Sequence, residues 1–91
     1  MMIGDNMDIN KYSGKDNYGK PKSEFIEQLA KCTDEDLLEK CRHYIWLSAY
    51  ANNNARSDFH WMCDACYDES KKRDEKASIY EKAYRLVEKS L

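Results

Sequence analysis

The stretch TDEDLLEKCRHYIWLSAYANNNARSD, residues 33–58, decides the fold, because it has the pattern of a long helix followed by a turn. It begins with a threonine and three acidic residues, which is typical of a helix N-terminus. Apolar side chains then recur at helical spacing at Leu37, Cys41 and Ile45. The asparagines that follow favour a helix end, since Asn tolerates left-handed backbone geometry. The stretch therefore predicts a helix over 34–52 and a turn after it.

Helical patterns also flank this stretch on both sides. Apolar residues at helical spacing predict a helix over 22–31. Ser57 or Asp58 suits the cap of a helix that follows the turn, and Asp74 suits the cap of a last helix. Because neither Gly nor Pro separates these last two patterns, one continuous helix over about 57–90 is an equally good interpretation.

These patterns together predict an all-α fold, a small bundle of three or four helices around a central antiparallel hairpin. The helical domain is expected to span 21–91. Residues 1–20 are polar and hold all three glycines, so we expect a flexible N-terminal arm, with a short extended piece around Met7–Ile9. The 35% of charged residues and the single proline disfavour a β-sandwich, which needs frequent turn residues.

The composition also makes several classes of function unexpected. Fifteen basic and seventeen acidic residues are interspersed and give a net charge of −2, so we expect no direct nucleic-acid binding. The chain has no apolar run of the roughly 18 residues that a membrane span needs. Its N-terminus lacks the pattern of a secretory signal, which favours a cytoplasmic protein with reduced cysteines.

The four cysteines leave open a zinc-stabilised helical domain as an alternative. Cys63 and Cys66 have the C-x-x-C spacing of many zinc ligands, but this pair falls inside a helical pattern. A matching second pair is missing, because eight residues separate Cys32 from Cys41. Buried free thiols are the commoner fate of such cysteines, so we expect neither a metal nor another cofactor.

Candidate binding residues gather around the predicted turn and the helix before it. Exposed Tyr and Trp side chains are frequent anchors of protein interfaces, and a turn with Asn, Arg and His offers donors to an anion or to a partner's backbone. We do not expect an enzyme, because a pair of helices supplies neither a strained nucleophile loop nor oxyanion donors. The candidate residues are Trp46, Tyr50, Asn53, Asn54, Arg56, His60 and Trp61.

The segment YIWLSAYANNNARSDFHWMCDACYDESKKR, residues 44–73, resembles a stretch found in short uncharacterised proteins of tailed bacteriophages and prophages. The resemblance implies a small phage protein in the host cytosol, with inhibitors of host defence such as anti-CRISPR proteins as the best-known class. Our main hypothesis is a non-catalytic protein that binds a host protein complex, as a homodimer. The alternative is a helical binder that sequesters an anionic nucleotide at Arg56, His60 and Trp61.

Overall fold

The computed structural model describes residues 11–90 of the chain, and these form four α-helices. The helices are α2 (Lys22–Lys31), α3 (Asp34–Tyr50), α4 (Asp58–Arg73) and α5 (Ser78–Ser90). The described residues contain no β-strand, so the predicted all-α class is confirmed. The extended piece predicted around Met7–Ile9 lies outside the described residues. Within the described range, no helix has both the length and the apolar character needed to cross a bilayer.

The predicted helix starts follow the capping chemistry of the sequence. The Thr33 hydroxyl accepts a hydrogen bond from the backbone N–H of Asp36 at 3.1 Å, as expected for an N-cap residue. Ser57 caps α4 in the same way, through the backbone N–H of Phe59 at 3.2 Å. The helix α3 ends at Tyr50, two residues before the predicted end, because the asparagine turn begins at once.

The last part of the chain forms two helices, so the single helix over 57–90 is wrong. Asp74 leaves the helical conformation, and its carboxylate accepts a hydrogen bond from the backbone N–H of Ser78 at 2.9 Å. Ala77 has a φ of 52°, a left-handed conformation that a continuous helix cannot contain. The hydrogen bond from Ser78 confirms that Asp74 helps to begin α5, although the helix starts four residues later than the carboxylate.

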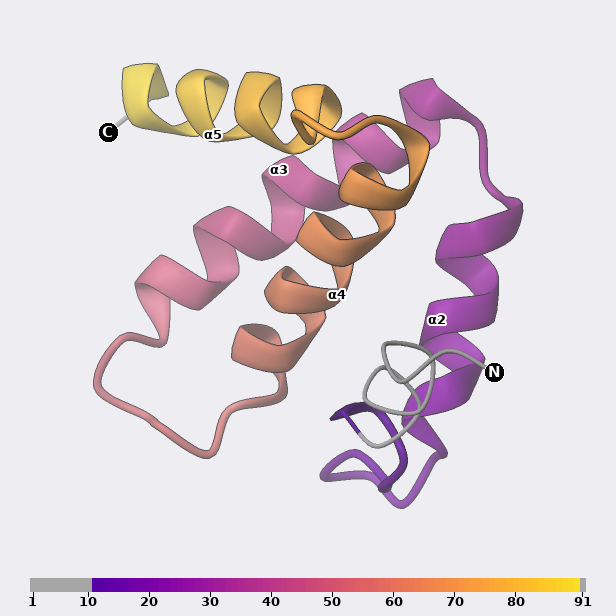
Figure 1. Cartoon of the computed structure of the whole chain (residues 1–91). Helices are drawn as coiled ribbons and strands as arrows, with labels where there is room; N and C mark the ends of the chain where they lie inside the picture. Colours follow the sequence, from indigo (N-terminus) through magenta and orange to yellow (C-terminus); the bar gives the residue numbers. More distant parts are fainter. Residues whose placement is uncertain (1–10, 91) are drawn as a thin grey trace.

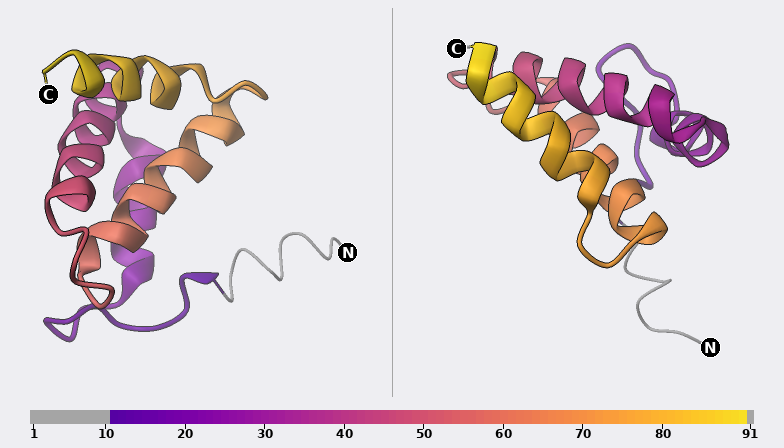
Figure 2. Two further views of the ribbon diagram at one scale, coloured as in Figure 1. Left: turned by 90° about the vertical axis from the view of Figure 1, so that its left-hand side faces the viewer. Right: turned by 90° about the horizontal axis from the view of Figure 1, so that it is seen from above.

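The helix α3 lies between two neighbours, and Figures 1 and 2 show the arrangement. It forms a hairpin with α4 across the turn at 51–57, and α5 packs over α3 at the end of the hairpin away from that turn (Figure 1). The helix α2 packs against α4 on the other side. The predicted central hairpin is therefore present, and α4 contacts all three other helices.

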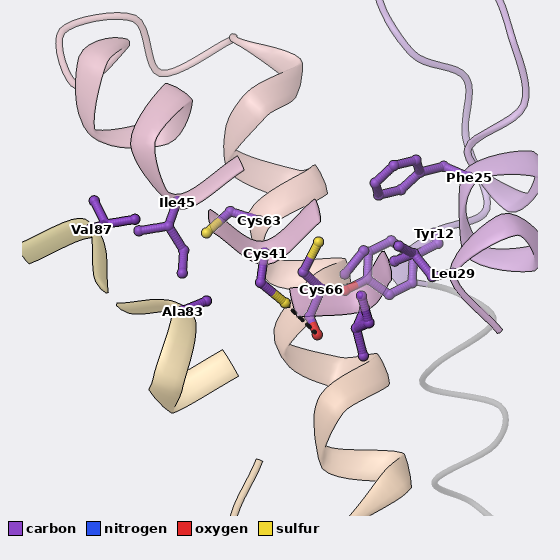
Figure 3. Packing of buried hydrophobic residues seen from close by; sticks show 11 residues of the cluster. Tyr12, Phe25, Leu29, Cys41, Ile45, Cys63, Cys66, Ala83 and Val87 are labelled. Atoms are coloured by element: carbon purple, nitrogen blue, oxygen red, sulfur yellow. Dashed lines mark hydrogen bonds between the residues drawn. The ribbon is translucent and has the colours of Figure 1, made fainter. Parts of the chain in front are cut away.

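The core is built mainly from small and medium-sized side chains. In Figure 3, Ile45, Ala83 and Val87 lie on one side, Phe25 and the other N-terminal residues lie on the other, and the cysteine side chains lie between them. Leu37, Cys41 and Ile45, the apolar positions that repeat at helical spacing in the sequence, are all buried. The buried apolar residues are Tyr12, Phe25, Leu29, Leu37, Cys41, Ile45, Cys63, Ala65, Cys66, Ala77, Ala83 and Val87.

Arg73, the last residue of α4, joins this helix to the loop between α2 and α3. Its guanidinium donates hydrogen bonds to the backbone carbonyls of Leu29 and Cys32, both at 2.8 Å. It also pairs with the carboxylates of Glu69 at 2.9 Å and Asp34 at 2.8 Å. Leu29 and Cys32 lie at the C-terminal end of α2, where the cation satisfies the Cys32 carbonyl and adds a second donor to the Leu29 carbonyl, which also accepts from the backbone N–H of Cys32.

Residues 11–20, which we assigned to the predicted arm, contact the helical domain at several points. The Tyr12 ring is buried, and its hydroxyl donates a hydrogen bond to the Asp68 carboxylate of α4. Lys11 forms an ion pair with the same carboxylate at 3.1 Å. The backbone N–H of Asn17 donates to the carboxylate of Asp58 at 3.0 Å. Residues 1–10 of the arm lie outside the described residues.

Candidate binding surface

Trp46 and Tyr50 form a stacked pair on the outer side of α3. Their ring centroids lie 5.4 Å apart with an interplanar angle of 8°, and the two side chains are 45% and 78% exposed. The pair faces outward because Cys41 and Ile45 occupy the inward positions of the same helix. Each ring restricts the other, so the pair presents a preformed apolar surface to solvent.

A shallow hollow of about 240 Å³ adjoins this pair, at the junction of α3 and α5. Arg42 is held there by the Glu39 carboxylate at 3.1 Å, and His43 packs edge-on against the Tyr44 ring at 4.9 Å between centroids. We refer to Arg42, His43, Trp46 and Tyr50 as the aromatic face. The hollow is lined by Glu39, Arg42, His43, Trp46, Val87 and Ser90.

The turn after α3 presents Asn53, Asn54 and Arg56, which are all exposed. The Asn54 side-chain oxygen accepts a hydrogen bond from the backbone N–H of Arg56 at 3.1 Å, and this contact shapes the turn. The Arg56 guanidinium has neither a hydrogen bond nor an ion pair with any residue in the range 11–90. The Arg56 guanidinium is therefore free to bind a partner.

His60, in contrast, uses both ring nitrogens within the protein. Its Nε2 lies 3.1 Å from the carbonyl oxygen of Ala51 and 2.9 Å from that of Asn54, so this nitrogen carries a proton and donates it. Its Nδ1 lies 2.7 Å from the Ser48 hydroxyl. The imidazole thereby satisfies carbonyls at the end of α3 and fixes the turn against α4.

Trp61 lies on the side of α4 that faces α2. Its indole N–H donates to the Asp58 carboxylate at 2.9 Å, and its ring meets the Phe25 ring edge-on at 5.5 Å between centroids. The Lys22 ammonium lies 5.1 Å from the centre of the indole. The seven candidates therefore fall into three groups. Two lie on the aromatic face, three lie in the exposed turn, and His60 and Trp61 are packed within the protein.

Three of the four cysteines lie in the core, between α3 and α4. The Cys41 thiol points to the Cys66 carbonyl oxygen at 4.0 Å (Figure 3). A side-chain hydrogen bond with Cys41 and burial raise the pKa of the Cys66 thiol, and burial raises the pKa of Cys63. Cys32 lies apart, 3.8 Å from an Arg73 guanidinium nitrogen. Over residues 11–90, no group of three or more His, Cys, Asp or Glu side chains is arranged to hold a metal ion.

Two further surface features were not predicted from the sequence. One is a pocket of about 360 Å³ between α2 and α4, lined by Ile26 and Ala65 from these helices and by Tyr12 from the N-terminal segment. The other is a basic groove along the outside of α5, to which Lys82, Arg85 and Lys89 contribute. The helical spacing of these three cations was visible in the sequence, whereas the pocket depends on two helices that pack only through tertiary contacts.

Comparison with known proteins assigns the chain to no family. Neither a protein-family model, nor a curated protein, nor a solved structure matches this chain.

Proposed function

We propose that the chain is a non-catalytic protein that binds another protein through the aromatic face. The observation that carries this proposal is the stacked and exposed pair of Trp46 and Tyr50. Tyr and Trp dominate the binding energy of protein interfaces, since each covers a large area with few rotatable bonds. A pair that is already stacked loses little further conformational entropy on binding, so more of its contact energy contributes to affinity.

The chemistry of the nucleophile and base candidates supports a non-catalytic role. His60 is engaged at both ring nitrogens by groups that hold the turn, so a general base would first have to break these contacts. A thiolate is the nucleophilic form of cysteine, and the raised pKa values of Cys63 and Cys66 favour the thiol. These groups therefore serve packing and turn formation.

A more specific version of the proposal follows from the resemblance of residues 44–73 to phage proteins. In this version the chain is a homodimer that binds a host protein complex and inhibits a defence function. The aromatic face supports protein binding in general, and the identity of the partner rests on the resemblance.

The proposal is tested by a capture experiment with matched variants. A tagged chain is incubated with lysate of the bacterial host, the captured protein is purified, and its affinity is measured by calorimetry. We expect the double variant Trp46→Ala, Tyr50→Ala to weaken binding by about 30-fold or more, the effect of losing one or two anchor residues. Tyr18→Ala is the control, because Tyr18 is 87% exposed but lies in the N-terminal segment.

The proposal fails if the double variant binds the captured protein as tightly as the wild type. The same preparations examined by light scattering test the homodimer. A wild-type mass that equals one chain at every concentration measured would contradict it.

A further inference from the structure

The outside of α5 carries a groove with an uneven distribution of charge. The groove measures about 530 Å³, and Glu81 is its one acidic wall residue. Lys82, Arg85 and Lys89 follow each other at helical spacing, while Ala83 and Val87 occupy the buried side of the same helix. The residues that line it are Lys76, Ser78, Glu81, Lys82, Arg85, Leu86 and Lys89.

The cations of this groove have no acidic partner within the described part of the chain. Among the described residues, only Lys11, Arg42 and Arg73 are paired with a carboxylate, each at 3.1 Å or less. No such pair involves Lys76, Lys82, Arg85 or Lys89. Because four cations and one carboxylate line the groove, it is a local concentration of positive charge on a chain whose net charge is −2.

The groove meets the aromatic face at the last turn of α5. Leu86 and Lys89 line the groove, while Val87 and Ser90 line the hollow beside Trp46. One extended or helical segment that crosses this turn would contact both surfaces. Its acidic side chains would meet the cations, and an apolar side chain would reach the stacked rings.

We propose that the α5 groove binds an acidic segment of the protein partner. This inference rests on the proposed function, and it names the chemistry of the partner: carboxylate side chains next to an apolar or aromatic anchor. A protein segment fits better than a nucleic acid, because a nucleic acid extends beyond the groove and would meet the net negative charge of the chain. A short acidic segment responds chiefly to charges within the Debye length of about 8 Å. Leu86 also offers it an apolar contact in the groove.

The test uses a fluorescein-labelled Glu-rich peptide with a central Trp-Leu pair, titrated with the full chain and followed by fluorescence polarisation. We expect the triple variant Lys82→Ser, Arg85→Ser, Lys89→Ser to weaken binding by about ten-fold or more, as three exposed charge contacts are lost. The control variant Lys15→Ser, Lys20→Ser, Lys31→Ser removes the same charge from exposed residues outside α5 and should bind as the wild type. Added salt should weaken wild-type binding, and a peptide with Gln in place of Glu should bind about ten-fold more weakly or worse, because it keeps only the apolar anchor.

Each remaining outcome contradicts the inference. It is wrong if the wild type does not bind the Glu-rich peptide, if the groove variant binds it as tightly as the wild type, or if the control variant loses as much affinity. It is also wrong if single-stranded DNA of similar length binds more tightly than the peptide, since the groove would then select phosphates. A Glu-rich peptide without the Trp-Leu pair tests the groove alone, so this result is independent of how the Trp46 and Tyr50 variant behaves in the capture experiment.

Discussion

The two ends of α4 are both rich in polar side chains, yet they use them differently. At the N-terminal end, His60 and Trp61 are half-buried and their polar atoms bind groups from the turn and the helix start. At the C-terminal end, Glu69 and Ser70 are buried, with 8% and 1% of their surface exposed. The N-terminal end, which the sequence analysis treated as a possible binding site, is thus only half-buried. The C-terminal end, with its charged and small residues, is packed more tightly.

The difference arises from what each end can reach. At the C-terminal end, Arg73 finds the carbonyls at the end of α2, and its ion pair allows the Glu69 carboxylate to be buried. The Ser70 hydroxyl accepts a hydrogen bond from the backbone N–H of Tyr80 at 3.0 Å, at the first turn of α5. A polar residue can therefore be buried when its own helix or a neighbouring helix supplies its hydrogen-bond partner.

Replacing Arg73 with Ala should be the most damaging change at either end of α4. It leaves the Glu69 carboxylate buried without its cation, and it removes the donor to the carbonyls of Leu29 and Cys32. Breaking a buried pair in this way costs about 3 kcal/mol or more, so the free energy of unfolding in urea should fall by that amount. Circular dichroism at increasing urea concentration measures it.

Arg42→Ala is the matched control for this change. Arg42 also pairs with a glutamate of its own helix, but the Glu39 side chain is exposed and the pair lies at the surface. An exposed pair contributes about 0–1 kcal/mol. Equal losses of stability in the two variants would show that the C-terminal end of α4 is not the more tightly packed end.

The burial of Cys66 in the middle of α4 should make the free energy of unfolding depend on pH. The pKa of Cys66 is raised in the fold, so the folded thiol keeps its proton while the unfolded thiol loses it above its ordinary pKa of about 8.5. Stability is therefore fully present below this value and is lost as the pH rises, by about 1.4 kcal/mol per pH unit for one such thiol. Urea unfolding between about pH 8 and 10.5 should show this slope, and Cys66→Ala should reduce it. An unchanged slope in the variant would contradict the burial of this thiol.

The sequence predicts the places of the apolar residues in this fold better than the contacts of the polar residues. Apolar periodicity and caps located all four described helices, because Leu37, Cys41 and Ile45 repeat at helical spacing and Thr33 and Ser57 have the right chemistry. The separation of α4 from α5 was undecided, since Ala77 gives no sign in the sequence that its backbone turns left-handed.

The polar residues were harder to place because their partners are distant in the chain. Arg73 binds carbonyls more than forty residues away, and no local pattern reports such a contact. Tyr12 likewise appeared to belong to a polar arm, while its burial depends on Asp68 and on the Trp61 ring. The exposed pair of Trp46 and Tyr50 was predictable, since a helix with apolar residues over more than half its circumference must leave some of them outside.

Replacing His60 with Ala tests the N-terminal end of α4. The change removes the donor to the carbonyls of Ala51 and Asn54 and the contact with the Ser48 hydroxyl. Because the site is half-exposed and water can replace some of these contacts, we expect a loss of about 1–2 kcal/mol in the free energy of unfolding. Asn53→Ala in the same turn is the control and should change stability by less than about 0.5 kcal/mol. If His60→Ala lowered the free energy of unfolding as much as Arg73→Ala, the two ends of α4 would not differ in how tightly they are packed.

The smallest effect on stability is expected for Arg56, which lies just before the first residue of α4, whereas Arg73 is the last residue of that helix. Its guanidinium is exposed and has no ion pair within the described residues, so Arg56→Ala should leave stability within about 0.5 kcal/mol of the wild type. Calorimetry with an adenine nucleotide then tests the alternative function at this end of the helix. If the wild type binds the nucleotide and Arg56→Ala abolishes that binding, a nucleotide binder replaces the protein binder as the better hypothesis. If neither chain binds it, while Arg56→Ala keeps most of the affinity for a captured protein, the free cation is one peripheral contact of a broader interface.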